Sequence, residues 1–177
     1  MEETAEAFTE LLETEEMHPQ LILQQQGMTE AEREAFLGRF EETPPEGLIG
    51  FCVMGGIFSE GIDLKAERLI GAIVVGPGLP QVCRERELLK NFYDARGEDG
   101  FFYAYLCPGM NKVLQSAGRV IRTEADEGVI LLLDERFAAA RYRNLFPAEW
   151  QAPQTCTLQT VQGCLAKFWS ERQTERI

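Results

Sequence analysis

The 177-residue sequence lacks most of the features that mark secreted, membrane or metal-binding proteins. Its longest apolar runs, at 69–76 and 128–133, are far shorter than the roughly 20 residues that span a membrane. A basic start followed by an apolar stretch is absent, so no secretory signal is indicated. No two of its five cysteines have C-x-x-C spacing, and it has one histidine. We expect a globular cytoplasmic protein with reduced thiols, no membrane segment and no metal site of its own.

The sequence also lacks an excess of basic residues. Its net charge is −12, and residues 1–46 hold 13 acidic side chains against two basic ones. A protein that binds nucleic acid unaided is usually basic. The charge therefore argues against strong independent DNA binding, although it permits a shared site in which another domain supplies the positive field.

Apolar periodicity and turn residues predict alternating helices and strands. Thr29 stands three residues before Glu32, the spacing of a helix-capping box. The expected helices are 2–16, 29–42, 85–95, 110–121, 137–146 and 157–171, and the expected strands are 20–26, 48–54, 69–75 and 128–133. Because these strands are apolar along their length, we predict an α/β fold with a mostly parallel sheet covered by helices on both faces. Ligands of such sheets bind beyond the carboxyl ends of the strands, which points to the segment after Met54 and to the segments flanking the strand at Gly128.

A glycine-rich segment follows the expected strand at 48–54. It contains Gly55, Gly56 and Ser59, which allow backbone to approach a ligand closely. Glu60 and Asp63 are three residues apart and could face one site. The spacing does not match the phosphate loop G-x-x-x-x-G-K-[ST], which occurs nowhere in the chain. An ordinary glycine-rich turn between strands explains the composition equally well.

The pattern Gln115-x-x-Gly118-Arg119-x-x-Arg122 lies in the expected helix 110–121. On a helix these positions share one face, which would carry an amide, a small residue and two guanidinium groups. Two arginines one turn apart repel each other unless an anion lies between them, and a polyphosphate would pair with both. Taken alone, the pattern favours a solvated basic face that pairs with nearby acids.

The apolar strand 128–133 ends at Asp134 and Glu135. A strand followed by two acids is also found at the magnesium site of ATPases. Because this chain has no phosphate loop, we favour an interpretation in which the acids cap the end of the strand.

A second cationic group consists of Arg84, Arg86 and Lys90, with Phe92 and Tyr93 close by. Cations among aromatic rings can hold a nucleic-acid strand by phosphate contact and base stacking. Glu85 and Glu87 weaken this interpretation, so an amphipathic helix is at least as good an explanation.

Taken in order, these segments resemble the second helicase domain of superfamily 2 helicases of the DinG/XPD type. The match runs from about residue 24 to about residue 150. Its most specific parts are the glycine-rich segment and the Gln-Gly-Arg-Arg segment, in the right order and about fifty residues apart. The segments that carry it are 26–30, 53–64, 68–71, 79–81, 103–105, 114–122 and 133–137.

The resemblance implies a RecA-like three-layer sandwich and a role for each motif. Gln115, Arg119 and Arg122 match motif VI, in which the glutamine approaches the γ-phosphate of ATP and the arginines act as arginine fingers. Gly118 would lie beside the nucleotide. The segment 55–63 matches motif V. There Gly55, Gly56 and Ser59 would lie near single-stranded DNA, and Glu60 and Asp63 near the nucleotide.

Comparison with the family pattern also identifies motifs that this sequence lacks. The family's first domain carries the phosphate loop, a D-E-x-H motif and usually a four-cysteine iron–sulfur cluster, and none of these occurs here. We therefore expect residues 1–177 to form a single second helicase domain of a longer protein. It would have an acidic helical part at 1–46, a motif-bearing core at 47–150 and a helical tail at 151–177.

In that hypothesis the partners are a first helicase domain of the same polypeptide and single-stranded DNA, and ATP and Mg²⁺ bind in a site that the missing first lobe completes. The isolated chain would not hydrolyse ATP. One alternative is a non-catalytic acidic α/β module, derived from a helicase, that binds proteins. Another is a complete nucleotide hydrolase that uses Asp134 and Glu135, which would require ATPase activity from this chain alone.

Overall fold

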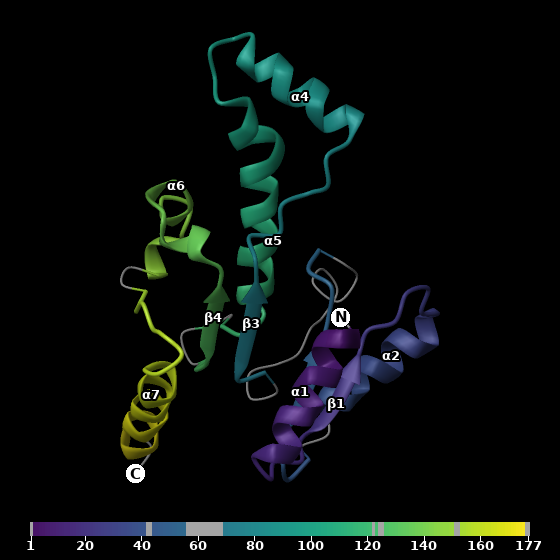
Figure 1. Ribbon diagram of the computed structural model, residues 1–177, viewed down its shortest axis with the longest axis vertical. Coiled ribbons are helices and arrows are strands. Elements are labelled where there is room, and N and C mark those ends of the chain that lie inside the picture. Colours follow the sequence, from purple (N-terminus) through teal and green to yellow (C-terminus); the bar gives the residue numbers. More distant parts are fainter. Residues whose placement is uncertain are drawn as a thin grey trace.

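The computed structural model describes residues 2–41, 44–55, 69–121, 123, 126–150 and 153–175. Within these ranges the chain forms two separate two-stranded sheets, each of them parallel and accompanied by helices (Figure 1). The predicted alternation of helices and parallel strands is confirmed. A single sheet in a three-layer sandwich is not seen among these residues. None of the described helices is both long enough and apolar enough to cross a membrane.

The first sheet pairs β1 (Gln20–Leu23) with β2 (Leu48–Phe51), and α1 (Glu2–Thr14) and α2 (Glu30–Gly38) accompany it. The predicted capping box begins α2, because the Thr29 side chain accepts a hydrogen bond from the Glu32 amide and the Glu32 carboxylate accepts one from the Thr29 amide. The short helix η1 (Arg39–Glu41) continues α2. Buried Phe36 centres a small core with Ile22, Met28, Leu37, Phe40 and Leu69.

The second sheet pairs β3 (Gly71–Val75) with β4 (Val129–Leu133), and α5 (Cys107–Ala117) lies against it (Figure 1). The main core forms between them. Val74 is buried on the covered face of the sheet, and Leu106, Met110 and Val113 are each at most 1% exposed. Phe137 and Tyr142, which follow β4, close the same cluster.

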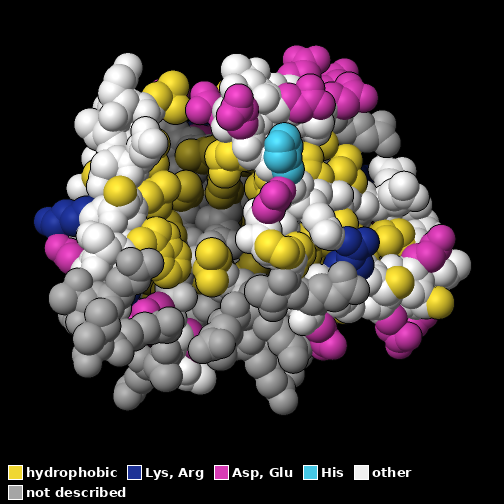
Figure 2. All heavy atoms as spheres, turned by 90° about the horizontal axis from the view of Figure 1, so that it is seen from below, with side chains coloured by type: hydrophobic (Ala, Val, Ile, Leu, Met, Phe, Trp, Pro, Cys, Tyr) yellow, Lys and Arg dark blue, Asp and Glu magenta, His cyan; other side chains and the backbone are white. Residues whose placement is uncertain are grey.

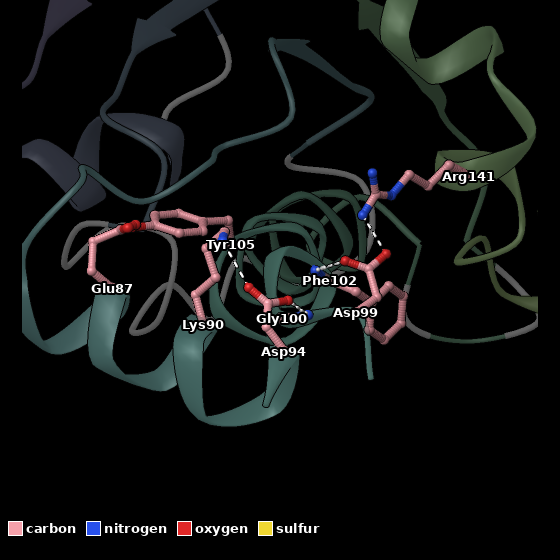
Figure 3. A network of polar contacts seen from close by, with 8 residues as sticks. All are labelled: Glu87, Lys90, Asp94, Asp99, Gly100, Phe102, Tyr105 and Arg141. Atoms are coloured by element: carbon pink, nitrogen blue, oxygen red, sulfur yellow. Dashed lines mark hydrogen bonds and ion pairs between the residues drawn. The ribbon is translucent and has the colours of Figure 1, made fainter. Parts of the chain in front are cut away.

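Helix α4 (Arg84–Asp94) lies at one end of the molecule and is joined to η3 (Phe102–Leu106), a π-helix, by a polar network (Figure 3). The Asp94 carboxylate accepts hydrogen bonds from Lys90 and from the amide of Gly100. A Cβ at position 100 would lie 2.1 Å from the carbonyl oxygen of Lys90, so only glycine fits this close approach. The network therefore fixes the start of η3, which leads directly into α5.

The segments after β4 differ from the predicted single helices. Two short helices, η4 (Glu135–Ala138) and α6 (Ala140–Arg143), replace the expected helix 137–146, because Ala139 between them has extended backbone. The short helix η5 (Ala148–Trp150) follows. The last helix, α7 (Val161–Glu175), begins later than predicted, after a turn in which Thr160 Oγ1 accepts a hydrogen bond from the Thr157 amide.

One face of the β3–β4 sheet is apolar and open. Side chains alternate along a strand, so Ile73 and Val75 point away from buried Val74. They are 61% and 72% exposed, and Leu133, which pairs with Val75, is 53% exposed. The view from below shows hydrophobic side chains gathered in a hollow (Figure 2). The prediction that helices cover both faces is therefore not met within the described residues, where α5 covers one face.

Candidate functional site

Helix α5 carries the Gln115-x-x-Gly118-Arg119 pattern at its carboxyl-terminal end. Gln115 is exposed in the last turn of the helix, and Gly118 is the C-cap residue. The next two amides, those of Arg119 and Val120, bond to carbonyls three residues back instead of four. The backbone thus tightens into a turn, and Arg119 is half-buried in it.

This geometry corrects the prediction for the motif. A helix over 110–121 was expected to put Gln115, Gly118, Arg119 and Arg122 on one face. The helix instead spans Cys107–Ala117, since glycine at position 118 favours helix termination. Gln115 therefore belongs to the helix and Arg119 to the turn, while Arg122 lies outside the described residues.

The turn after α5 is held against the start of β4. Val120 is 2% exposed, and a Cβ on Gly128 would lie 2.3 Å from Val120 Cγ1 and 3.0 Å from the carbonyl oxygen of Ile70. That same carbonyl accepts a hydrogen bond from the Val129 amide at 3.0 Å. Arg119 is therefore fixed beside the amino ends of β3 and β4.

The glycine-rich segment begins against the middle of α5. Gly55 has a left-handed backbone, with φ of +77°, and a Cβ placed on it would lie 2.7 Å from Lys112 Cδ. Gly78, in the loop after β3, lies on the same side chain, because its Cβ position is 3.6 Å from Lys112 Cβ and 2.8 Å from Met54 Sδ. The loops that leave the carboxyl ends of β2 and β3 thus meet on α5, as expected for a ligand site in a parallel sheet.

Asp134 caps the short helix that follows β4. The Asp134 carboxylate accepts hydrogen bonds from the Arg136 amide at 2.9 Å and from Arg136 Nη2 at 2.7 Å. The guanidinium holds the pKa of Asp134 below its usual value. This arrangement caps η4 and agrees with the capping interpretation. Among the residues that the structure describes, no three histidine, cysteine or acidic side chains are grouped to hold a metal ion.

The cationic group at 84–90 is used within the fold. Arg86 Nη1 donates a hydrogen bond to the carbonyl oxygen of Ala104 at 2.8 Å, and Lys90 pairs with Asp94 at 2.8 Å. The first contact joins α4 to η3, and the second belongs to the polar network at the end of α4. They favour the amphipathic-helix interpretation over a strand-binding patch.

Of the predicted site residues, the structure describes Gly55, Gln115, Gly118 and Arg119. Gly55 lies against Lys112 of α5, the helix that carries Gln115. Gly56, Ser59, Glu60, Asp63 and Arg122 lie outside the described residues. The contact between the two motifs is made by Lys112, which the sequence analysis did not single out. Its position three residues before Gln115, one helical turn away on the same face, was the available signal.

Comparison with known proteins finds similarity to helicases. A family model described as the helicase C-terminal domain matches residues 1–153. A probable ATP-dependent helicase of Methanocaldococcus jannaschii is 30% identical over 138 residues, which cover 73% of this chain and 20% of the relative. The regulator of telomere elongation helicase 1 of Bos taurus is 36% identical over 129 residues, with 68% and 10% covered.

A third relative is the ATP-dependent DNA helicase DinG of Photobacterium profundum. It is 35% identical over 89 residues, which cover 49% of this chain and 13% of the relative. The chain therefore spans a fifth or less of the length of each of these curated relatives.

Proposed function

Because this chain belongs to the helicase C-terminal domain family, with relatives among DinG-type helicases, we propose that it is the second motor lobe of an ATP-dependent DNA helicase. A first lobe of the same polypeptide completes the ATP site. In the assembled enzyme the sheet strands and helices form a RecA-like three-layer sandwich.

The proposed chemistry of this lobe rests on motif VI. Arg119 and Arg122 reach the γ-phosphate from the second lobe and stabilise the charge that develops on the transferred phosphoryl group. Gln115 approaches the same phosphate, and Gly118 lets the backbone lie close to the nucleotide. Hydrolysis removes the γ-phosphate contacts, so the cleft between the lobes opens.

Motif V couples that motion to DNA in this proposal. Gly55, Gly56 and Ser59 lie along single-stranded DNA, and Glu60 and Asp63 lie on the nucleotide side. The contact of Gly55 with α5 supports the coupling, since it joins the beginning of motif V to the helix that carries Gln115.

The observation that carries the proposal is the fixed position of Arg119 at the end of α5. An arginine finger has to be held in place before the reaction, because a mobile guanidinium would lose much of its effect on the transition state. Here the next residue, Val120, is buried against Gly128, so the turn cannot rotate freely.

The magnesium ion of this reaction is assigned to the first lobe. At the end of β4, both carboxylate oxygens of Asp134 accept hydrogen bonds from Arg136. This carboxylate therefore does not fit a magnesium site. In this proposal the present chain contributes cationic and amide groups to the ATP site.

The test is single-strand-stimulated ATP hydrolysis by a polypeptide that carries both lobes. Replacing Arg119 with alanine is expected to lower kcat by roughly 10³-fold or more, the range known for arginine fingers. Arg119→Lys keeps the charge but not the planar fork of donors, so it should recover only part of the rate.

The matched control is Arg96→Ala, which removes an exposed arginine that pairs with Glu98 in the loop after α4. It should leave kcat unchanged. Wild-type turnover in Arg119→Ala would contradict the assignment. Absence of ATP hydrolysis in the two-lobe wild type would instead favour a non-catalytic protein-binding module.

A further inference from the structure

Lys112 occupies a defined position between two loops. Its stem crosses the backbone of Gly55, where an added Cβ would lie 2.7 Å from Cδ, 2.8 Å from Cε and 3.2 Å from Nζ. Its Cβ is 3.6 Å from the Cβ position of Gly78. Both glycines have left-handed backbone, with φ of +77° and +61°. The lysine stem therefore packs against both loops, and a larger residue at position 55 or 78 would displace it.

Among the described residues, no carboxylate pairs with the ammonium group at the end of this stem. Within the described ranges Lys112 makes no ion pair and no side-chain hydrogen bond, although it is half-buried. The two other described lysines differ, because Lys90 pairs with Asp94 and Lys167 with Glu171. A partly buried charge that gives up water without gaining a partner is unfavourable, so an anion at this point would be stabilising.

The position along α5 separates this cation from the arginine of motif VI. Lys112 lies five residues before the last residue of α5, which corresponds to about 7.5 Å of helix rise, and Arg119 lies in the turn beyond that end. Lys112 also lies near the carboxyl ends of β2 and β3, whereas Arg119 lies beside the amino ends of β3 and β4. The ammonium group of Lys112 therefore starts from the side of the helix where Gly55 lies, and Arg119 from the opposite end of the sheet.

We propose that Lys112 binds a backbone phosphate of single-stranded DNA where the strand passes Gly55. The inference rests on the proposed function, which places Gly55 along the DNA. Lysine binds phosphate as a compact point charge and reads no sequence, so it suits a motor that moves along any strand.

The experiment measures binding of a fluorescent oligo(dT) strand to a polypeptide that carries both lobes, over a series of salt concentrations. Each phosphate contact on a single strand contributes roughly 0.7 to the slope of log K against log salt. Lys112→Gln should reduce the magnitude of that slope by about 0.7. Lys112→Arg should keep the slope, since the charge remains.

Lys167→Gln is the matched control, because it removes an exposed lysine from α7 that already pairs with Glu171. It should leave both the slope and the affinity unchanged. Thermal melting of each variant shows whether it is folded. Lys112→Met, which keeps the length of the stem without its charge, replaces the glutamine variant if that one is unstable and should reduce the slope equally.

The outcomes separate the two proposals. An unchanged slope in folded Lys112→Gln, with oligo(dT) still bound by the wild type, overturns the Lys112 contact and leaves the proposed function standing. Failure of the wild type to bind oligo(dT) even at low salt overturns the proposed DNA contact and this inference with it. Weaker binding of a fluorescent ATP analogue by a two-lobe Lys112→Gln protein, with an unchanged DNA slope, assigns the phosphate to the nucleotide and also overturns it.

Discussion

Val120 and Gly128 touch across the connection from α5 to β4, with 2.3 Å between Val120 Cγ1 and the position that a Cβ on residue 128 would take. Gly128→Ala should lower the free energy of unfolding by about 1–3 kcal/mol, the usual range for overpacking. Urea denaturation measures the loss. The added Cβ would also lie 3.0 Å from the carbonyl oxygen of Ile70, so a shift of the backbone cannot easily relieve the clash with Val120.

A double variant checks that the contact causes this loss. Val120→Ala removes the methyl group that the new Cβ would strike, so Gly128→Ala should cost less in that background. Residues in contact show such non-additivity, whereas independent sites add. Strictly additive losses would contradict the close packing of this turn.

Arg141 connects α6 to the start of η3, and its removal should be mildly destabilising. Its guanidinium lies 2.5 Å from the Asp99 carboxylate (Figure 3). It also lies 5.0 Å from the centre of the Phe101 ring. Both charged groups are about half-exposed, so we expect Arg141→Gln to cost about 1 kcal/mol or less. Thermal or urea unfolding, combined with Asp99→Asn in a double-mutant cycle, separates the ion pair from the ring contact. Equal effects of Arg141→Gln in the presence and absence of Asp99 would exclude a coupling between them.

The local elements of the fold were predictable because their signals lie within a few residues of each other. The apolar runs gave β3 and β4, and the Thr29-to-Glu32 spacing gave the capping box that begins α2. The end of α5 was missed because apolar periodicity continues to Val120 and Ile121. The chain leaves the helix at Gly118, and Val120 is buried by packing against Gly128, a contact that periodicity does not reveal.

The candidate site could be predicted only where the sequence repeats a motif. Gln115, Gly118 and Arg119 were proposed from their spacing, and in the structure they lie at one end of α5. The spacing of Lys112 from Gln115 was a weaker signal, since a single lysine in a helix is ordinarily a solvated residue. Its contact joins Gly55 to α5, two segments far apart in sequence, and such a contact depends on the path of the loops after β2 and β3.

Tyr105 should make the fold sensitive to alkaline pH. Its hydroxyl donates a hydrogen bond to Glu87 Oε1 at 2.5 Å, and this bond, with burial and the charge of Glu87, raises the pKa of Tyr105 to about 12. The unfolded chain would ionise this tyrosine near pH 10. Its contribution to stability is therefore complete below about pH 10 and lost as the pH rises from about 10 to about 12.

Stability measured across that pH interval tests the Tyr105 prediction. Tyr105→Phe cannot ionise, so its loss of stability should be smaller than that of the wild type. Glu87→Gln should lower the pKa of Tyr105, because it removes the charge that opposes ionisation. Identical alkaline profiles for the wild type and Tyr105→Phe would show that this hydroxyl does not control the effect.

Cys156 and Cys164 should be the first cysteines to pair under mild oxidation, because their Sγ atoms are 3.5 Å apart. With oxidised glutathione as the oxidant, the two thiols lose two protons and two electrons, an S–S bond forms, and the glutathione disulfide is reduced to two thiols. The hydrogen bond to Cys164 raises the pKa of Cys156, so the reaction should accelerate with pH as thiolate forms. Peptide mapping by mass spectrometry should find these two residues joined and Cys107 free. In Cys164→Ser, Cys156 should instead carry a glutathione adduct. Persistence of both thiols in the wild type, or a different pairing, would show that the two sulfurs do not meet in solution.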